Sequence, residues 1–107
     1  MSTREIPRDQ WREELDRFSR AHKGQVVNVD VTDGGGQQKK TEARDLPLVG
    51  VSLDAPRADR IAVLVGDKPN DHVTHEVSGA VRIQMEGDGA IRIDANDGST
   101  TVVALKR

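Results

Sequence analysis

The chain divides into one segment with a helical repeat and a longer part with the two-residue alternation of strands. In the first segment Trp11, Leu15 and Phe18 fall at i, i+4 and i+7. They therefore share one face of a helix, and Ile6 lies just upstream on the same face. The spacing predicts a helix over residues 6–23 that packs on a sheet through the only two aromatic side chains of the protein.

Residues 25–107 contain short alternating runs separated by turn residues, which predicts antiparallel β-structure. Pro47 and Gly50 interrupt the long run KKTEARDLPLVGVSLD, so we expect two strands or one strongly bent strand there. The run RIAVLV is apolar on both faces, as a central strand covered on both sides would be.

The last third reads as a β-meander, because GDG and NDGS supply hairpin turns between its strands. Alternation predicts an inward face and an outward face. The inward face holds Val81, Ile83, Met85, Ile91 and Ile93, and the outward face holds Arg82, Gln84, Arg92 and Asp94.

Together these elements predict a mostly β (α+β) fold in a single domain over residues 1–107. The N-terminal helix would pack on a small, strongly bent antiparallel sheet, or on a Sm-like or SH3-like barrel, that ends in the meander. Hydrophobic residues make up 35% of the 107 residues, so the core must be thin and built mainly from Val, Ile, Leu and Ala.

Charge and cysteine content exclude several classes of function. The 16 basic and 18 acidic residues interleave without a basic block, so the electrostatic footprint of a nucleic-acid binder is missing. Without cysteine there is no disulfide, thiolate metal site or cysteine nucleophile, which fits a reducing compartment. The charged N-terminus has no apolar signal region, and IAVLV is too short to span a membrane. We expect a cytoplasmic protein.

The stretch GDKPNDHVTHEVSG, with two of the three histidines, is the strongest candidate for a chemical site. In a strand His72 and His75 point to opposite faces, so one ion cannot bind both unless the chain bulges. His72 and Glu76 share a face, and a third ligand would have to come from elsewhere, such as Asp67 or Asp71. We interpret the stretch as a loop running into a strand with two solvated imidazoles. A weak metal-dependent hydrolase using His72, His75 and Glu76 is an alternative.

No cofactor is expected. The glycines of DGGG are not followed by the Gly-Lys-Ser/Thr of a phosphate loop, and GVSLD lacks the second glycine of a nucleophile elbow. The residues predict no enzymatic activity.

The stretches REIPRDQWREELDRFSRAHKG, ARDLPLVGVSLD and DRIAVLVGDKPNDHVTHEV resemble an uncharacterised family of small bacterial proteins. The resemblance covers nearly the whole chain and implies no catalytic residue. A looser likeness, of fold alone, is to Sm-like small barrels, whose loops often bind RNA through aromatic, Asn, Arg or Lys side chains. Here the loop DAPRADR offers Arg57 and Arg60, so RNA binding through these residues, with Arg82 and Arg92, is a second alternative.

We predict a small interaction module that self-associates as a homo-oligomer. The final run TTVVALK is apolar on both faces, with Val102 and Ala104 opposite Val103 and Leu105. As an edge strand it would also offer backbone donors and acceptors to a neighbouring chain. In the alternative, a monomer, Lys106 and Arg107 guard that edge and the partner is a different, unknown protein.

Overall fold

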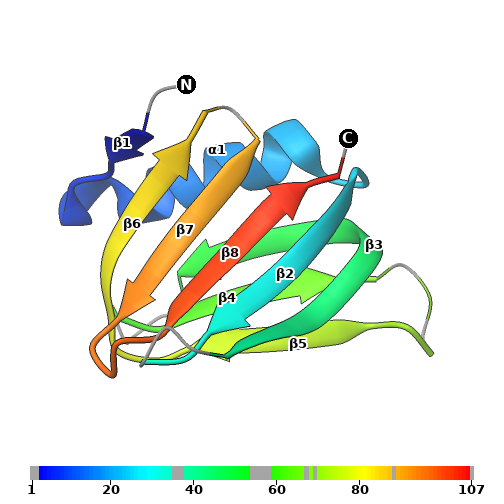
Figure 1. Ribbon diagram of the computed structural model, residues 1–107. Coiled ribbons are helices and arrows are strands. Elements are labelled where there is room, and N and C mark those ends of the chain that lie inside the picture. The colour runs from blue at the N-terminus through cyan, green and yellow to red at the C-terminus, as the bar shows by residue number, and fades with distance from the viewer. Residues whose placement is uncertain are drawn as a thin grey trace.

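The computed structural model describes residues 3–34, 38–53, 59–66, 68, 70–87 and 89–106. Within them eight strands form one antiparallel sheet in the order β1-β6-β7-β8-β2-β3-β4-β5 (Figure 1). One α-helix lies against this sheet, which confirms a mostly β fold. The elements are β1 (Thr3–Glu5), the 3₁₀ turn η1 (Arg8–Gln10), α1 (Trp11–His22), β2 (Val26–Thr32), β3 (Lys39–Leu53), β4 (Ile61–Val65), β5 (Val73–Val77), β6 (Ala80–Glu86), β7 (Ala90–Ala95) and β8 (Thr100–Leu105).

The 15-residue β3 is one strongly bent strand that belongs to two layers. Its first part pairs with β2 and its second part with β4, so the sheet turns over on itself (Figure 1). The register shifts opposite Asn28, where Asp45 takes a positive φ of 58° and its N–H bonds Asn28 Oδ1 at 2.8 Å. Two further shifts lie between Val29 and Asp30 of the β2 pairing and between Leu48 and Gly50 of the β4 pairing. The expected bend is confirmed, and the described sheet stays open, with β1 and β5 as its edges.

The helix packs on β3 through the predicted apolar face. Trp11, Leu15 and Phe18 are each at most 2% exposed, as is Ile6, whose carbonyl accepts a 3.0 Å hydrogen bond from Trp11 Nε1. The helix is shorter than the predicted 6–23, because Pro7 is extended (φ −57°, ψ 145°) and a 3₁₀ turn precedes Trp11. The short β1 was not expected, since its three exposed polar residues carry no apolar alternation.

Two expectations about strand faces are corrected. Val81 is 52% exposed, because a register shift at the start of β6 turns Ala80 inward in its place. Residues Ile83, Ile91 and Ile93 are buried as predicted, and Met85 is partly buried. The β4 strand is buried on one face only; the residues on its other face, Ala62 and Leu64, are partly exposed.

The last strand is not an edge, contrary to the prediction, because β8 lies between β7 and β2. Alternation within a strand does not reveal its neighbours, and the real edges are β1 and β5. Lys106 does not guard an edge: its Nζ lies 2.8 Å from Asp45 Oδ1. Arg107 is outside the described residues.

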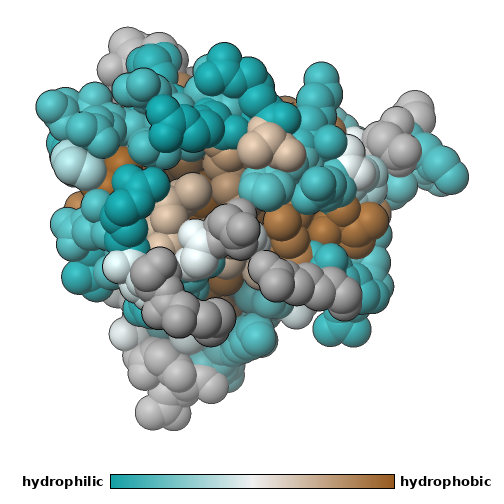
Figure 2. Space-filling view, turned by 90° about the horizontal axis from the view of Figure 1, so that it is seen from above, coloured by the Kyte–Doolittle hydropathy of each residue, from teal (hydrophilic) through white to brown (hydrophobic). Residues whose placement is uncertain are grey.

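Seen from above, hydrophilic side chains surround a central area in which apolar side chains reach the surface (Figure 2). Exposed carboxylate–arginine pairs at i, i+4 lie along the outer side of α1, with Glu13 to Arg17 at 3.8 Å and Asp16 to Arg20 at 3.4 Å. In the described part of the chain no helix has the length and apolar character that crossing a membrane requires.

Candidate functional site

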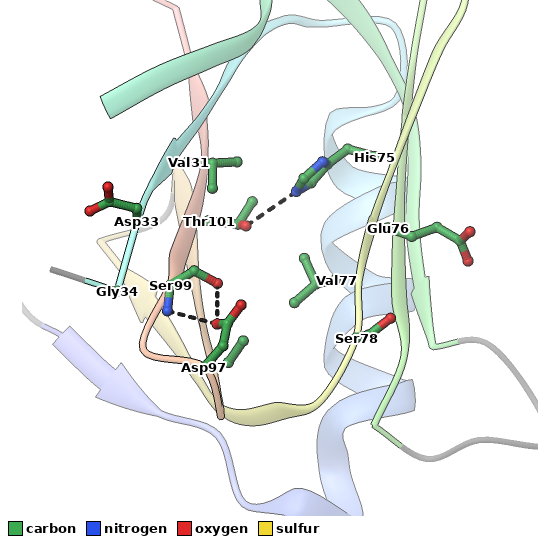
Figure 3. A pocket seen from close by; sticks show the side chains of 11 residues that line it. Val31, Asp33, Gly34, His75, Glu76, Val77, Ser78, Asp97, Ser99 and Thr101 are labelled. Carbon is green, nitrogen blue, oxygen red and sulfur yellow. Dashed lines mark hydrogen bonds between the residues drawn. The ribbon is translucent and has the colours of Figure 1, made fainter. Parts of the chain in front are cut away.

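A hollow of about 420 Å³ opens between the two layers of the sheet, beside β5. One wall is β5 and the corner after it, and the opposite wall is the end of β2 with the β7–β8 turn (Figure 3). In that turn Asp97 Oδ1 accepts hydrogen bonds from the backbone N–H and the hydroxyl of Ser99, at 2.8 and 2.6 Å. These bonds lower the pKa of Asp97, so the mouth of the hollow carries a carboxylate in a fixed turn.

His75 projects from β5 into this hollow (Figure 3). Its Nε2 lies 3.3 Å from Thr101 Oγ1, and its Nδ1 lies 3.8 Å from Glu42 Oε1. Glu42 in turn meets Lys40 Nζ at 3.4 Å. The His75 side chain is 19% exposed and Thr101 only 2%. Four residues from β3, β5 and β8 thus form a polar cluster that runs from the exposed Lys40 to the buried Thr101.

The environment of His75 favours its neutral form. Burial lowers its pKa below the ordinary value of 6.5; the carboxylate of Glu42 opposes this shift, and the charge of Lys40 adds to it. The imidazole is therefore neutral near pH 7, and its Nε2 and the Thr101 hydroxyl share one hydrogen bond across the hollow.

The structure does not bring together His72, His75 and Glu76, the three candidate residues for a metal-dependent hydrolase. His75 faces the hollow, whereas His72 and Glu76 are exposed, and Glu76 points away from the hollow (Figure 3). His72 precedes β5 and does not line the hollow, and the expectation of two solvated imidazoles is wrong for His75, whose side chain is largely buried. Asp71 caps its own turn, with Oδ1 2.9 Å from the N–H of Lys68, and Asp67 lies outside the described residues. The described residues contain no group of three or more His, Cys, Asp or Glu side chains placed to hold a metal ion.

The predicted arginine set is brought together only in part. Arg82 Nε and Arg92 Nε both bond the Asp94 carboxylate, at 2.9 and 3.3 Å. Burial alone would raise the pKa of Asp94, but hydrogen bonds from Thr100 and Arg82 and the charge of Arg92 hold it below its ordinary value. Arg60 is partly buried just before β4, and Arg57 is outside the described residues.

The second feature beside the hollow is the free edge of β5. On the other edge of this layer, Ser19 Oγ accepts from the N–H of Val51 at 2.8 Å and lies 2.9 Å from its carbonyl oxygen. Both backbone groups of Val51 therefore turn away from β4, so Val51 and its partner Val63 form a non-hydrogen-bonded pair. The backbone of Val63 must then bond β5, where its partner is His75.

Because these directions alternate along an antiparallel strand, the N–H and C=O groups of Thr74 and Glu76 point outward from β5. Their side chains are exposed as well. No strand of the described chain pairs with this edge, and β5 forms the lower border of the molecule in Figure 1.

The sequence indicated neither Glu42 nor Thr101 as a partner of His75. They lie on strands distant in the chain, and only the bend of β3 and the central position of β8 bring them to β5. The sequence did not indicate the role of Ser19 either, because no local pattern shows that a serine near the end of a helix contacts a strand distant in the chain.

Comparison with known proteins gives one match. The model of a family of unknown function (DUF5335) matches residues 2–107. The chain belongs to this family. The expected resemblance to an uncharacterised family is thereby confirmed over nearly the whole chain, and the family assigns no activity to the hollow or to the β5 edge. No curated protein and no solved structure matches the chain.

Proposed function

We propose that the protein is a non-catalytic interaction module of the bacterial cytoplasm that self-associates by adding a strand at β5. The observation that carries this proposal is the unpaired edge at Thr74 and Glu76, in a layer whose other edge is bonded to α1. A strand edge with outward N–H and C=O groups is a template for another strand. A cytoplasmic location is supported by the lack of cysteine.

The surface next to this edge supports the same proposal. Ala62 and Leu64 are partly exposed on the outer face of β4, the strand next to β5. A second copy at β5 would extend the sheet and, with it, this partly apolar face. Pairing of one short strand buries little area, so we expect association in the micromolar range or weaker.

Strand addition is favoured over the RNA-binding alternative drawn from the Sm-like likeness. Arg82 and Arg92 already bond one carboxylate, which reduces what they offer to phosphates. It is also favoured over a metal-dependent hydrolase, because His75 lines the hollow, whereas His72 precedes β5, is exposed and does not line it.

The first test is the mass in solution of the unmodified chain and of two variants at Thr74. Light scattering after size exclusion, from about ten to several hundred micromolar, should give a mass that rises above the 11.7 kDa of one chain. Thr74→Pro removes one outward N–H and leaves the β4–β5 ladder intact, so it should stay monomeric.

Thr74→Ala is the matched control, since it removes the same side chain and keeps the N–H. It should associate like the unmodified protein. Circular dichroism must show that Thr74→Pro is folded. A mass of 11.7 kDa for the unmodified chain at every concentration would overturn the proposal.

A further inference from the structure

The proposed self-association leaves open how two copies meet, and the geometry of β5 answers this. Resting on that proposal, we infer that β5 pairs antiparallel with β5 of a second copy about a two-fold axis at His75, and that protonation of His75 releases the pair. The inference combines the register of the free edge with the position of His75 in the hollow.

The register follows from the outward groups. In a two-fold antiparallel pair the hydrogen-bonded positions must be those whose backbone faces the edge, Thr74 and Glu76. Pairing Thr74 with Glu76 of the second copy overlaps all five residues of β5 and sets His75 opposite itself.

The neighbouring registers are worse. Sliding the second β5 by two residues places Glu76 opposite Glu76 of the second copy, and like charges directly opposite each other destabilise a sheet. The same slide in the other direction, with Thr74 opposite itself, overlaps only three of the five strand residues.

In the favoured register His75 is a non-hydrogen-bonded position, where opposing Cα atoms come within about 4.5 Å. The two imidazoles then lie side by side on the inner face of the continuous sheet. Pairing buries each ring further and adds a second ring beside it. Both changes favour the neutral form, so a proton binds more tightly to the separate chains than to the pair.

The charged groups around His75 do not reverse this sign. Glu42 and Lys40 face it from β3, and Asp33 and Asp97 line the far wall of the hollow. From β8 it meets the uncharged Thr101, and its β4 partner is Val63. These groups surround His75 in the single chain as well as in the pair, so what pairing adds is the second imidazole and the burial.

The register is tested by single cysteines, because the chain has no cysteine of its own. His75→Cys places two thiols at a separation that a disulfide spans, so it should form a linked dimer with oxidised glutathione. In this register Thr74 lies opposite Glu76 of the second copy, so a cysteine at either position is diagonal to the same cysteine in the other chain. Thr74→Cys and Glu76→Cys should therefore form several-fold less linked dimer. A dimer that forms preferentially through Thr74→Cys or Glu76→Cys would overturn the register.

The proton dependence is tested by sedimentation at pH 7.5 and pH 5.5, above the range in which ordinary carboxylates titrate. We expect the dissociation constant of the unmodified chain to rise several-fold on acidification. His75→Gln retains a hydrogen-bonding side chain without the charge. The ratio of its dissociation constants at the two pH values should be close to one, whatever its affinity at pH 7.5.

His72→Gln is the control, because it removes an exposed histidine of the same stretch, and it should keep the full ratio. The outcomes separate the two proposals. A chain that is monomeric at both pH values defeats the proposed function. A chain that associates equally at both, or a His75→Gln variant as sensitive as the unmodified chain, leaves the function standing and overturns the inference.

Discussion

The two edges of the layer made by β3, β4 and β5 differ in what meets their backbone groups. Where β3 no longer pairs with β2, its neighbours are α1 and the turn that follows α1. Ser19 Oγ bonds Val51. The N–H of Gly24 donates to the Leu48 carbonyl at 2.8 Å, and the N–H of Leu48 donates to the Gln25 carbonyl at 2.9 Å. The β5 edge has no such neighbour among the described elements. The comparison indicates that α1 closes the β3 edge, whereas the β5 edge remains available to a partner.

Packing follows the same division. The helix side is sealed by Trp11, Leu15 and Phe18, and the Arg8 guanidinium lies 4.4 Å from the centre of the Trp11 ring. The β5 side encloses an open hollow in which His75 reaches across to the opposite layer. We therefore expect substitutions on the helix side to affect folding, and substitutions on the β5 side to affect association and its pH dependence.

The largest effect is expected for Trp11→Ala. Trp11 is 1% exposed, and its removal leaves a cavity between α1 and β3 together with an unbonded Ile6 carbonyl. The free energy of unfolding should fall by about 3 kcal/mol or more. Denaturant titration followed by circular dichroism measures it. Arg12→Ala, at the exposed neighbouring position, is the control and should change it by about 0.5 kcal/mol or less.

Ser19→Ala tests the closed edge directly. It removes the hydroxyl that accepts from the Val51 N–H and whose one proton is shared between the carbonyl oxygens of Leu15 and Val51, at 2.8 and 2.9 Å, so the N–H of Val51 loses its partner. The expected loss is about 1–3 kcal/mol in the same titration. The control is Ser52→Ala, at an exposed position one residue along β3, which should be near neutral. If Ser19→Ala were equally neutral, the closure of this edge by α1 would not contribute to stability.

The sequence was sufficient for the parts of the fold that depend on local periodicity. The helical face, the bend of β3 and the meander all follow from spacing or from turn residues that act within a few positions. The bend, however, uses Asp45 in a left-handed conformation, and no glycine marked that position. The inward turn of Ala80 depends on a bulge that alternation alone does not reveal.

The candidate site depends on strand order, which local patterns do not encode. TTVVALK reads like an edge strand, and it becomes central only because β2 and β7 both pair with it. HVTHEV reads like any half-buried strand, and it becomes the edge because the bend of β3 carries β4 and β5 to the other layer. The two-residue repeat predicted that His72 and His75 would not share a site, and only His75 lines the hollow; the partners of His75 were not predictable.

The smallest effect we predict separates the proton response of a single chain from that of the pair. His75 has a pKa below 6.5 in the folded chain, because burial favours the neutral ring. Between 6.5 and that lower pKa the unfolded chain binds more protons than the folded one. The contribution of His75 to the free energy of unfolding is therefore complete above pH 6.5, and it is lost as the pH falls through the pKa of His75 in the folded chain.

The measurement uses Thr74→Pro, so that dissociation of copies plays no part. Its free energy of unfolding, from urea titrations between pH 7.5 and pH 5, should decline modestly toward acid, and the double variant Thr74→Pro with His75→Gln should decline less. Asp94 does not interfere, because its pKa lies below 3.8 and its stabilisation is lost only at lower pH. If the free energy of unfolding of the two variants declined equally toward acid, the ring of His75 would be as well hydrated in the hollow as in bulk water. The β5 side would then lack the desolvated imidazole on which its difference from the helix side partly rests.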